Sequence, residues 1–381
     1  NQNRLLTYGF ELAYNDVTSN AFGKTLAVSN DEVIDFSDDF LVQSRYPDGG
    51  SNYLSSAIYL GYRQDVSAKA TLNTGIRFTN THLQANWIDQ TFITLPDPSI
   101  TLANAALTAT LGYVYKPSKD WQINSVLSSG FRAPNIDDVG RVREKSGNIT
   151  IPNIYVTPEF AYSAEFGLQK YFNNRRFRIG GNVFYTLLDS YIQRDFVYAP
   201  NGSNLQVAFD NEFGNAVSNQ NKGTAYITGF TSSYLGQISN RWNTSGFITY
   251  TKGSTYDTKE PLSSIPPLFG QFEVSYKIEK LELGADFRFN SKKNIEDFNF
   301  TEGIDNHDLT PVIDPNATND ISKYYGTPSW NTLGFNGRYT FNDTLSFQAR
   351  IANLFDTHYR EFASGVSAPG RNISISFLAT F

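Results

Sequence analysis

The stretch Leu281–Phe289, which reads LELGADFRF, decides the fold class of this chain. Its odd-numbered positions are apolar, and the positions between them carry Glu282, Gly284, Asp286 and Arg288. A period of two residues is the signature of a β-strand with one apolar and one polar face. The stretch therefore predicts a strand that separates an apolar environment from a polar one.

The same alternation recurs along the whole chain, for example in Phe272–Ile278 and in Leu345–Ile351. We count about 14 such segments, each near the length of a tilted strand that crosses a bilayer. We expect them to begin close to Asn3, Tyr53, Lys69, Asn104, Asp120, Pro158, Arg175, Lys222, Asn240, Pro266, Lys280, Ser329, Thr344 and Asn372.

The connections between these segments alternate in length. Short connections such as Pro117–Lys119 and Asn342–Asp343 alternate with long ones such as Asn15–Asn52 and Asn294–Pro328. Tight turns at one rim and long loops at the other are typical of a bacterial outer-membrane β-barrel. The pattern predicts an all-β chain that forms a transmembrane antiparallel β-barrel, with both chain ends facing the periplasm.

Composition narrows the range of protein classes. The sequence of 381 residues contains no Cys, which excludes a disulfide scaffold and a Cys zinc site. Its formal net charge of −6 argues against nucleic-acid binding. A soluble β-sandwich or propeller would also use short alternating strands. Two features argue against it: charged residues recur opposite a nearly pure apolar face, and aromatics such as Trp121 and Trp242 lie near strand ends.

Two motifs resemble those of a known family, the TonB-dependent outer-membrane receptors. The segment Ser129–Asp138, which reads SGFRAPNIDD, resembles the FRAP box at the top of a barrel strand, and the last 29 residues are similar to the end of nearly every member. The set as a whole looks most like Bacteroidetes receptors of the haem and siderophore branch. The matching residues are Phe131, Arg132, Ala133 and Pro134, followed by Asn353, Leu354, Asp356, Tyr359, Arg360, Pro369, Gly370, Arg371 and Phe381.

The resemblance implies a barrel of about 22 strands that is filled by an N-terminal plug domain. The sequence shows only about 14 strands and no plug, so we expect residues 1–381 to be the C-terminal part of an outer-membrane β-barrel domain. A sheet cut from a larger barrel would leave two unpaired edges in lipid. Strands from the same polypeptide or from another chain are therefore expected to complete it.

The resemblance also implies a role in transport. The protein would lie in the outer membrane of a Gram-negative bacterium, contact outer-membrane lipid, and be inserted by the barrel-assembly machinery, with Phe381 as part of the insertion signal. It would import a ferric siderophore, haem or a similar large nutrient as cargo, with no intrinsic cofactor. The TonB–ExbB–ExbD complex would supply energy through the plug. A surface lipoprotein or other complex subunits are further expected partners.

Two other functions stay open at this point. The same barrel would serve as a structural subunit of an outer-membrane complex, with its transport function idle. In the second alternative, the chain would close on its own as a porin or lipid channel of about 14 strands.

No catalytic constellation stands out in the sequence, and we expect no enzyme activity. Carboxylates such as Glu282 and Asp286 fall on the polar face, where barrels normally carry charge, so a glycosidase pair is not favoured. The residues His82, His307 and His358 are far apart in sequence and lack a metalloprotease spacing.

Four residues are candidates for contact with a ligand. We expect His358 on the inward phase of its strand near the extracellular end, either as a ligand contact or as a hydrogen-bonded rim residue. Tyr155 follows a degraded form of the family's ligand box at Ile151–Ile154, and Tyr is able to ligate haem iron. Arg338 and Arg350 are expected in the lumen, where they would meet an anionic ligand or pair with plug carboxylates.

An acidic loop surrounds His307. Such a loop would either bind Ca²⁺ or form a solvated surface segment, and we favour the second interpretation and predict no metal site. Its acidic residues are Asp297, Glu302, Asp305, Asp308, Asp314 and Asp320.

Overall fold

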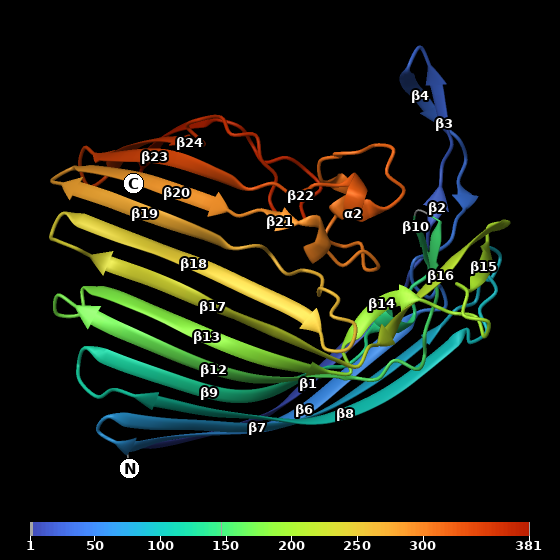
Figure 1. Ribbon diagram of the computed structural model, residues 1–381, viewed down its shortest axis with the longest axis horizontal. Helices are drawn as coiled ribbons and strands as arrows, with labels where there is room; N and C mark the ends of the chain where they lie inside the picture. Colours follow the sequence, from blue (N-terminus) through green and yellow to red (C-terminus); the bar gives the residue numbers. More distant parts are fainter. Residues whose placement is uncertain (1–2, 146, 381) are drawn as a thin grey trace.

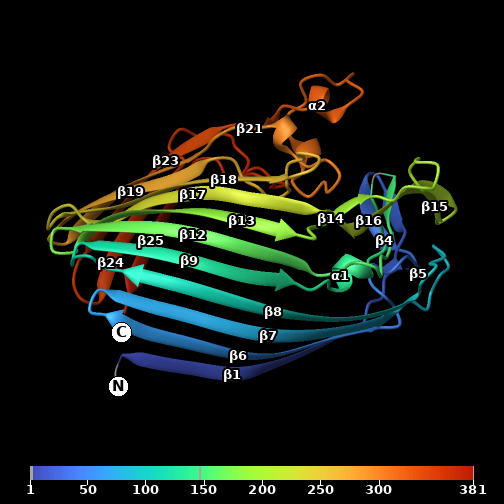
Figure 2. The ribbon, with the colours of Figure 1, turned by 60° about the horizontal axis from the view of Figure 1, so that its bottom comes forward.

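The computed structural model describes residues 3–145 and 147–380. Its main feature is one curved antiparallel sheet of 14 strands (Figures 1 and 2). In their order across the sheet, the strands are β1 (Arg4–Val17), β6 (Ser51–Ser67), β7 (Ala70–Asn86), β8 (Ser99–Tyr115), β9 (Trp121–Arg132), β12 (Glu159–Phe172), β13 (Phe177–Asp189), β17 (Thr224–Gln237), β18 (Trp242–Thr255), β19 (Phe269–Ile278), β20 (Leu281–Asn290), β23 (Trp330–Thr340), β24 (Leu345–Ala352) and β25 (Asn372–Ala379).

The strand pattern predicted from the sequence is confirmed. The 14 strands match the expected segments in number and order, and the largest error in a start is at β8, which begins at Ser99 rather than Asn104. Strands that neighbour each other in the sheet also follow each other in the chain, with short and long connections in alternation. Arg4 and Ala379 both lie at the end of the sheet that carries the short turns (Figure 1).

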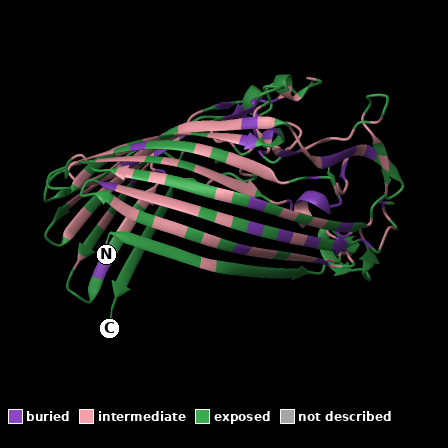
Figure 3. Cartoon of the chain, turned by 90° about the horizontal axis from the view of Figure 1, so that it is seen from below, coloured by how far each residue is buried: buried purple, intermediate pink, exposed green. Residues whose placement is uncertain are grey.

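The two faces of the sheet differ in polarity because side chains alternate along each strand. On the outer face, Leu283 and Phe335 are 49% and 43% exposed. On the inner face, Glu282 pairs in register with Arg338, and both line a hollow of about 680 Å³. The alternation appears as stripes of different exposure along the strands (Figure 3).

The sheet does not close on itself within the described residues. β1 and β25 stand at the two ends of the strand order, and each pairs with one neighbour only. Both edges are open: Phe10 in β1 is 81% exposed and Phe377 in β25 is 71% exposed. Because a free strand edge is not tolerated in lipid, this geometry argues against the self-contained porin.

The long connections form a layer at the other end of the sheet. A smaller sheet in this layer joins β10, β11, β14, β15 and β16. No helix in the described part of the chain is long and apolar enough to cross a membrane. The elements of the layer are β2 (Phe22–Gly23), β3 (Leu26–Ser29), β4 (Glu32–Phe36), β5 (Phe40–Leu41), α1 (Ile136–Val139), β10 (Arg143–Lys145), β11 (Asn148–Thr150), β14 (Ile192–Phe196), β15 (Gln206–Phe209), β16 (Glu212–Asn221), β21 (Lys293–Asn294), the 3₁₀ turns Ile295–Asp297 and His307–Leu309, α2 (Asp320–Lys323) and β22 (Gly326–Thr327).

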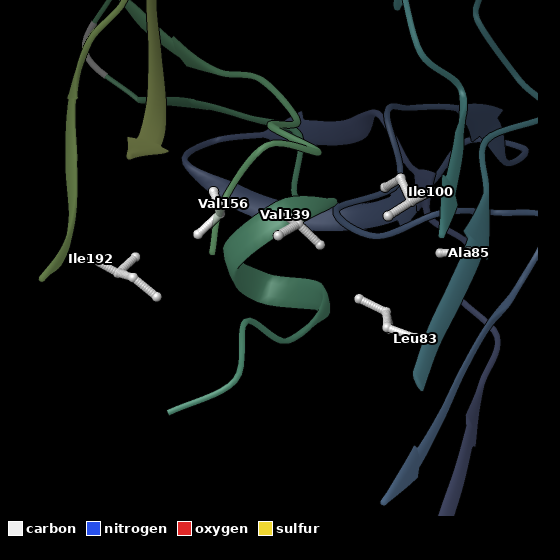
Figure 4. Close-up of a cluster of buried hydrophobic side chains, with 6 residues drawn as sticks. All are labelled: Leu83, Ala85, Ile100, Val139, Val156 and Ile192. Atoms are coloured by element: carbon white, nitrogen blue, oxygen red, sulfur yellow. The ribbon is translucent and has the colours of Figure 1, made fainter. Parts of the chain in front are cut away.

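A buried cluster joins this layer to the inner face of the sheet (Figure 4). Leu83 of β7 and Ile100 of β8 are 2% and 1% exposed, and Val139 of α1 is fully buried among them. Ala85 of β7, Val156 from the same connection as α1, and Ile192 of β14 complete the cluster. Burial of such side chains contributes roughly 1.5–3 kcal/mol each. The connections are therefore a packed layer with a fixed position above the sheet.

Elements β2 to β5 form a narrow ribbon between β1 and β6 that projects away from the sheet (Figure 1). β2 pairs with β5, and β3 pairs with β4. Several of its apolar side chains face solvent, including Val28, Ile34 and Phe36 at 57%, 65% and 59% exposure. The ribbon therefore differs from the other long connections, which pack together.

Candidate ligand-binding site

The first motif, at the end of β9, fixes the start of the connection that follows. The Arg132 guanidinium pairs with the carboxylate of Asp138, a residue that is 7% exposed, and Pro134 is fully buried. Asn135 Oδ1 accepts the N–H groups of Asp137 and Asp138 at 2.9 and 3.1 Å, and Asp138 Oδ2 accepts the Asn135 N–H at 3.0 Å. This reciprocal capping box starts α1 and sets its angle to the sheet.

This corner also connects neighbouring loops. Asn219 Nδ2 donates to the Asp138 carbonyl oxygen at 3.2 Å, and Tyr46 Oη donates to Asp137 Oδ1 at 2.7 Å. Burial by itself would raise the pKa of Asp137, but the Tyr46 hydrogen bond and the charges of Arg141 and Arg45 lower it overall. Asp137 is thus held as a carboxylate that joins its own connection to residues 45–46.

The second motif shapes the connection between β24 and β25. Asn353 Oδ1 accepts the Thr357 N–H at 2.9 Å, and Asp356 Oδ1 accepts the Arg371 N–H at 2.6 Å. These bonds fold the segment back on itself, so the motif has a structural role here. Phe381, the last residue of the motif, lies outside the described residues.

His358 lies in this connection and not on a strand, which corrects its predicted position. β24 ends at Ala352 because Asn353 adopts a φ of 49°, which is incompatible with an extended strand. The His358 side chain is exposed, with Nε2 at 3.1 Å from Ser367 Oγ. Its predicted alternative as a hydrogen-bonded rim residue agrees with this contact.

His358 lines a hollow of about 260 Å³ at the loop end of β23. Trp330 and Tyr359 form one wall of the hollow, with ring centroids 4.2 Å apart. Trp330 is 7% exposed, and its indole Nε1–H finds no hydrogen-bond partner within the described ranges. An aromatic wall suits a flat ligand.

The other three candidates lie elsewhere. Arg338 and Arg350 line the larger hollow on the inner face, where Arg350 Nη2 is 3.3 Å from Asp286 Oδ1. Tyr155 lies just before β12, is 78% exposed, and lines neither hollow. The structure therefore brings the two arginines together but does not bring them to His358 or Tyr155.

The acidic segment around His307, residues 291–328, is solvated only in part: Asp297, Asp308 and Asp314 are exposed as expected, whereas Asp305 is buried. Asp305 is 3% exposed, and its two carboxylate oxygens accept the Ser264 N–H at 3.0 and 3.1 Å. Lys293 Nζ lies 3.7 Å from Asp305 Oδ2. Among the described residues, no group of three or more His, Asp or Glu side chains could hold a metal ion, so the Ca²⁺ interpretation gains no support.

Sequence reasoning missed the contact between this segment and β14. Glu302 Oε1 accepts the backbone N–H of Arg194 at 3.1 Å. Burial raises the pKa of Glu302, although the N–H and charge of Arg194 act in the opposite direction. The two residues lie 108 positions apart in loops that have no periodicity, so no sequence signal could have paired them.

The raised pKa of Glu302 predicts a pH dependence of loop stability. For an acid whose folded pKa lies above its unfolded value, the stabilisation is complete below the unfolded pKa, near about 4.3 for Glu. It is lost as pH rises through the folded pKa. We expect the free energy of local opening around residues 295–310 to fall from mildly acidic to neutral pH, and Glu302→Gln to reduce that fall. Hydrogen exchange measures this free energy. The exposed Glu212→Gln should leave the pH dependence unchanged, and equal slopes in both variants would contradict the prediction.

Comparison with known proteins adds to this geometry. A family model described as TonB dependent receptor-like, beta-barrel matches residues 1–354. A comparison with curated proteins finds no match.

Several solved structures have a similar fold. The copper transporter OprC has a TM-score of 0.74 at 17% identity, and the match covers 100% of this chain and 55% of that one. The siderophore receptor PiuA from Acinetobacter baumannii has a TM-score of 0.62 at 17% identity, over 90% and 45% of the two chains. The ferripyoverdine receptor of the outer membrane of Pseudomonas aeruginosa, bound to ferripyoverdine, has a TM-score of 0.68 at 16% identity, over 99% and 46%. The chain thus spans about half the length of these structures, and such identities show the fold alone.

Proposed function

The chain belongs to the TonB-dependent receptor family, and from this premise we propose that it is the C-terminal part of an outer-membrane β-barrel that imports a large nutrient. The observation that carries the proposal is the family match across a sheet with an apolar outer face and a polar inner face. Members of this family are transporters and receptors that work with TonB and a plug domain. Transport in the outer membrane is thus the best-supported function.

The proposed cargo is a ferric siderophore, haem or a similar large nutrient, which is a transported substrate and not a cofactor. Support comes from the similar folds of a siderophore receptor and a copper transporter. We assign His358, beside the Trp330 wall, to first contact with cargo, and Tyr155 to a second contact in the loops. Arg338 and Arg350 would meet an anionic cargo or the carboxylates of the plug inside the barrel.

The proposed partners follow from the same premise. The TonB–ExbB–ExbD complex would act through a plug, the barrel-assembly machinery would insert the protein, and outer-membrane lipid would cover the outer face. The Bacteroidetes-like branch stays a prediction from the motifs.

Uptake of radiolabelled iron tests the proposal in cells whose sole receptor is the complete polypeptide. We expect uptake of a ferric siderophore or haem to require TonB, because the polar lumen holds cargo but supplies no energy. An isogenic strain without TonB is the control. Equal uptake in both strains, or ion conduction through an unplugged pore, would rule out the proposal.

His358→Ala is expected to weaken cargo binding about tenfold, a loss of roughly 1.4 kcal/mol. The free energy of unfolding should change by less than about 0.5 kcal/mol, since the side chain is exposed and makes one hydrogen bond. Binding is measured by fluorescence titration and stability by thermal unfolding. His82→Ala on β7 is the matched control, and equal loss of binding in both variants would exclude a specific role for His358.

A structural role in a larger complex is a second candidate, and the projecting ribbon favours it. Exposed apolar side chains on a two-stranded ribbon are typical of a surface that meets another protein, such as a surface lipoprotein. Replacement of residues 24–37 by a short turn would separate the two roles. Loss of a co-purifying subunit while TonB-dependent uptake stays intact would show that the protein has an assembly role beside transport. An unchanged subunit composition would exclude the assembly role.

A further inference from the structure

A third hollow lies between the smaller sheet and the 291–328 segment and contains none of the four predicted residues. Its volume is about 510 Å³, within the range of roughly 300–1,000 Å³ that is usual for small-ligand sites. The smaller sheet contributes Lys145, Arg194 and Phe196 to one wall. The 291–328 segment contributes Phe300, His307 and Asp308 to the other. The two walls therefore carry groups of opposite charge.

Arg194 is the central residue of the basic wall. It is half-buried, and its Nε–H finds no hydrogen-bond partner in the part of the chain that the structure describes. Glu302, which also lines the hollow, accepts the backbone N–H of Arg194 at 3.1 Å. Burial and the nearby charge of Arg141 lower the pKa of Arg194, and the carboxylates of Glu302 and Asp137 offset only part of this effect. A buried guanidinium in this state is stabilised by an anion, and a carboxylate matches its planar donor geometry.

His307 is the central residue of the opposite wall. Its side chain is 10% exposed, and Nε2 lies 2.9 Å from Asp320 Oδ2. A carboxylate only accepts hydrogen bonds, so Nε2 donates its proton to Asp320. Nδ1 has no partner among the described residues. With the carboxylates of Asp308 and Asp320 on the same wall, this side of the hollow suits a ligand group that carries positive charge.

We propose that this hollow binds a short zwitterionic peptide, with its terminal carboxylate on Arg194 and its terminal ammonium at His307 and Asp308. Phe196 and Phe300 supply apolar surface for a side chain between the two termini. Lys145 adds a second cation on the carboxylate side. The inference rests on the proposed import function and names a ligand class for the loop layer.

Isothermal titration of the complete polypeptide in detergent tests this assignment with three probes of nearly equal size. They are the tripeptide Gly-Phe-Gly, its N-acetyl form and its C-terminal amide. We expect the free tripeptide to bind, and each blocked form to bind at least about tenfold more weakly because one charged contact is lost. Arg194→Gln should abolish the difference between the free acid and the amide. Arg241→Gln, which removes the same charge at the short-turn end, should leave it unchanged.

Equal affinity for all three probes, no binding at millimolar concentration, or an unaltered preference in Arg194→Gln would overturn the inference. Should Arg194→Gln fail to fold, the exposed Lys145→Gln provides the second variant, with an expected several-fold loss for the free acid only. An unaltered affinity in that variant would count against the site. Peptide binding in detergent needs no TonB, so its failure beside intact TonB-dependent iron uptake would refute this inference alone.

Discussion

Residues 1–381, expressed without any other chain, are expected to aggregate instead of forming a stable barrel. β1 and β25 each leave one edge unpaired, and β1 alone spans 14 residues. In hydrocarbon each unpaired backbone group costs several kcal/mol, so the open sheet is unstable in a bilayer. Refolding into lipid vesicles, followed by protease digestion and heat-dependent electrophoretic migration, measures barrel formation. The complete polypeptide should give a protected, heat-sensitive band under the same conditions.

A split version of the protein provides the matched control. Under the proposed function, co-refolding of residues 1–381 with the remainder of the polypeptide as a second chain should restore protection, because the strands expected there would cover both edges. A protease-resistant barrel formed by residues 1–381 alone would contradict the prediction and revive the self-contained porin.

Asp138→Ala is expected to open the connection between β9 and β12 while the sheet stays folded. The substitution removes the partner of Arg132 and the acceptor of the Asn135 N–H, at 3.0 Å. The Arg132 side chain is 46% exposed, so water is able to solvate it after the substitution. We therefore expect the free energy of local opening to fall by only about 1–3 kcal/mol. Such a change raises exchange of the α1 amides by roughly 5- to 150-fold. Hydrogen exchange and limited proteolysis between residues 133 and 158 measure it.

Asp120→Ala, in the short turn between β8 and β9, is the control for removal of a carboxylate. It should leave exchange in α1 unchanged. Protection of α1 that survives Asp138→Ala would show that the buried cluster around Val139, and not the capping box, holds this connection.

The strands could be predicted because one rule governs them. Each strand has an apolar outer face and a polar inner face, as in Leu281–Phe289, so alternation gives both its existence and its orientation. The rule fails at the start of β8, where Ile100 is apolar yet points inward. There the packed connections exclude water from the inner face, so the polarity of that face reverses and the segment Ser99–Ala103 loses its signature.

The candidate site was harder to predict because its contacts join distant connections. The motifs around Arg132 and Asn353 could be found as short, contiguous patterns, and they prove to be structural corners. Arg194 and Glu302 give no such pattern, since Arg194 is an ordinary charged residue in the short strand β14 and Glu302 is one in an irregular segment. Burial shifts the pKa values of both side chains. That burial depends on how four connections pack together, and the local sequence does not encode this packing.

The packing of the connections also constrains how the protein is able to diversify. Asn219 contacts Asp138, Glu302 contacts Arg194, and Asp305 contacts Ser264, so four connections share buried bonds. A substitution in one of them requires compensation in another, and these four are expected to evolve as one unit. The projecting ribbon of β2 to β5, residues 22–41, makes few such contacts and lies between two strands whose register is set by the sheet. It is a segment that is able to vary in length and sequence without disturbing the sheet from which it projects.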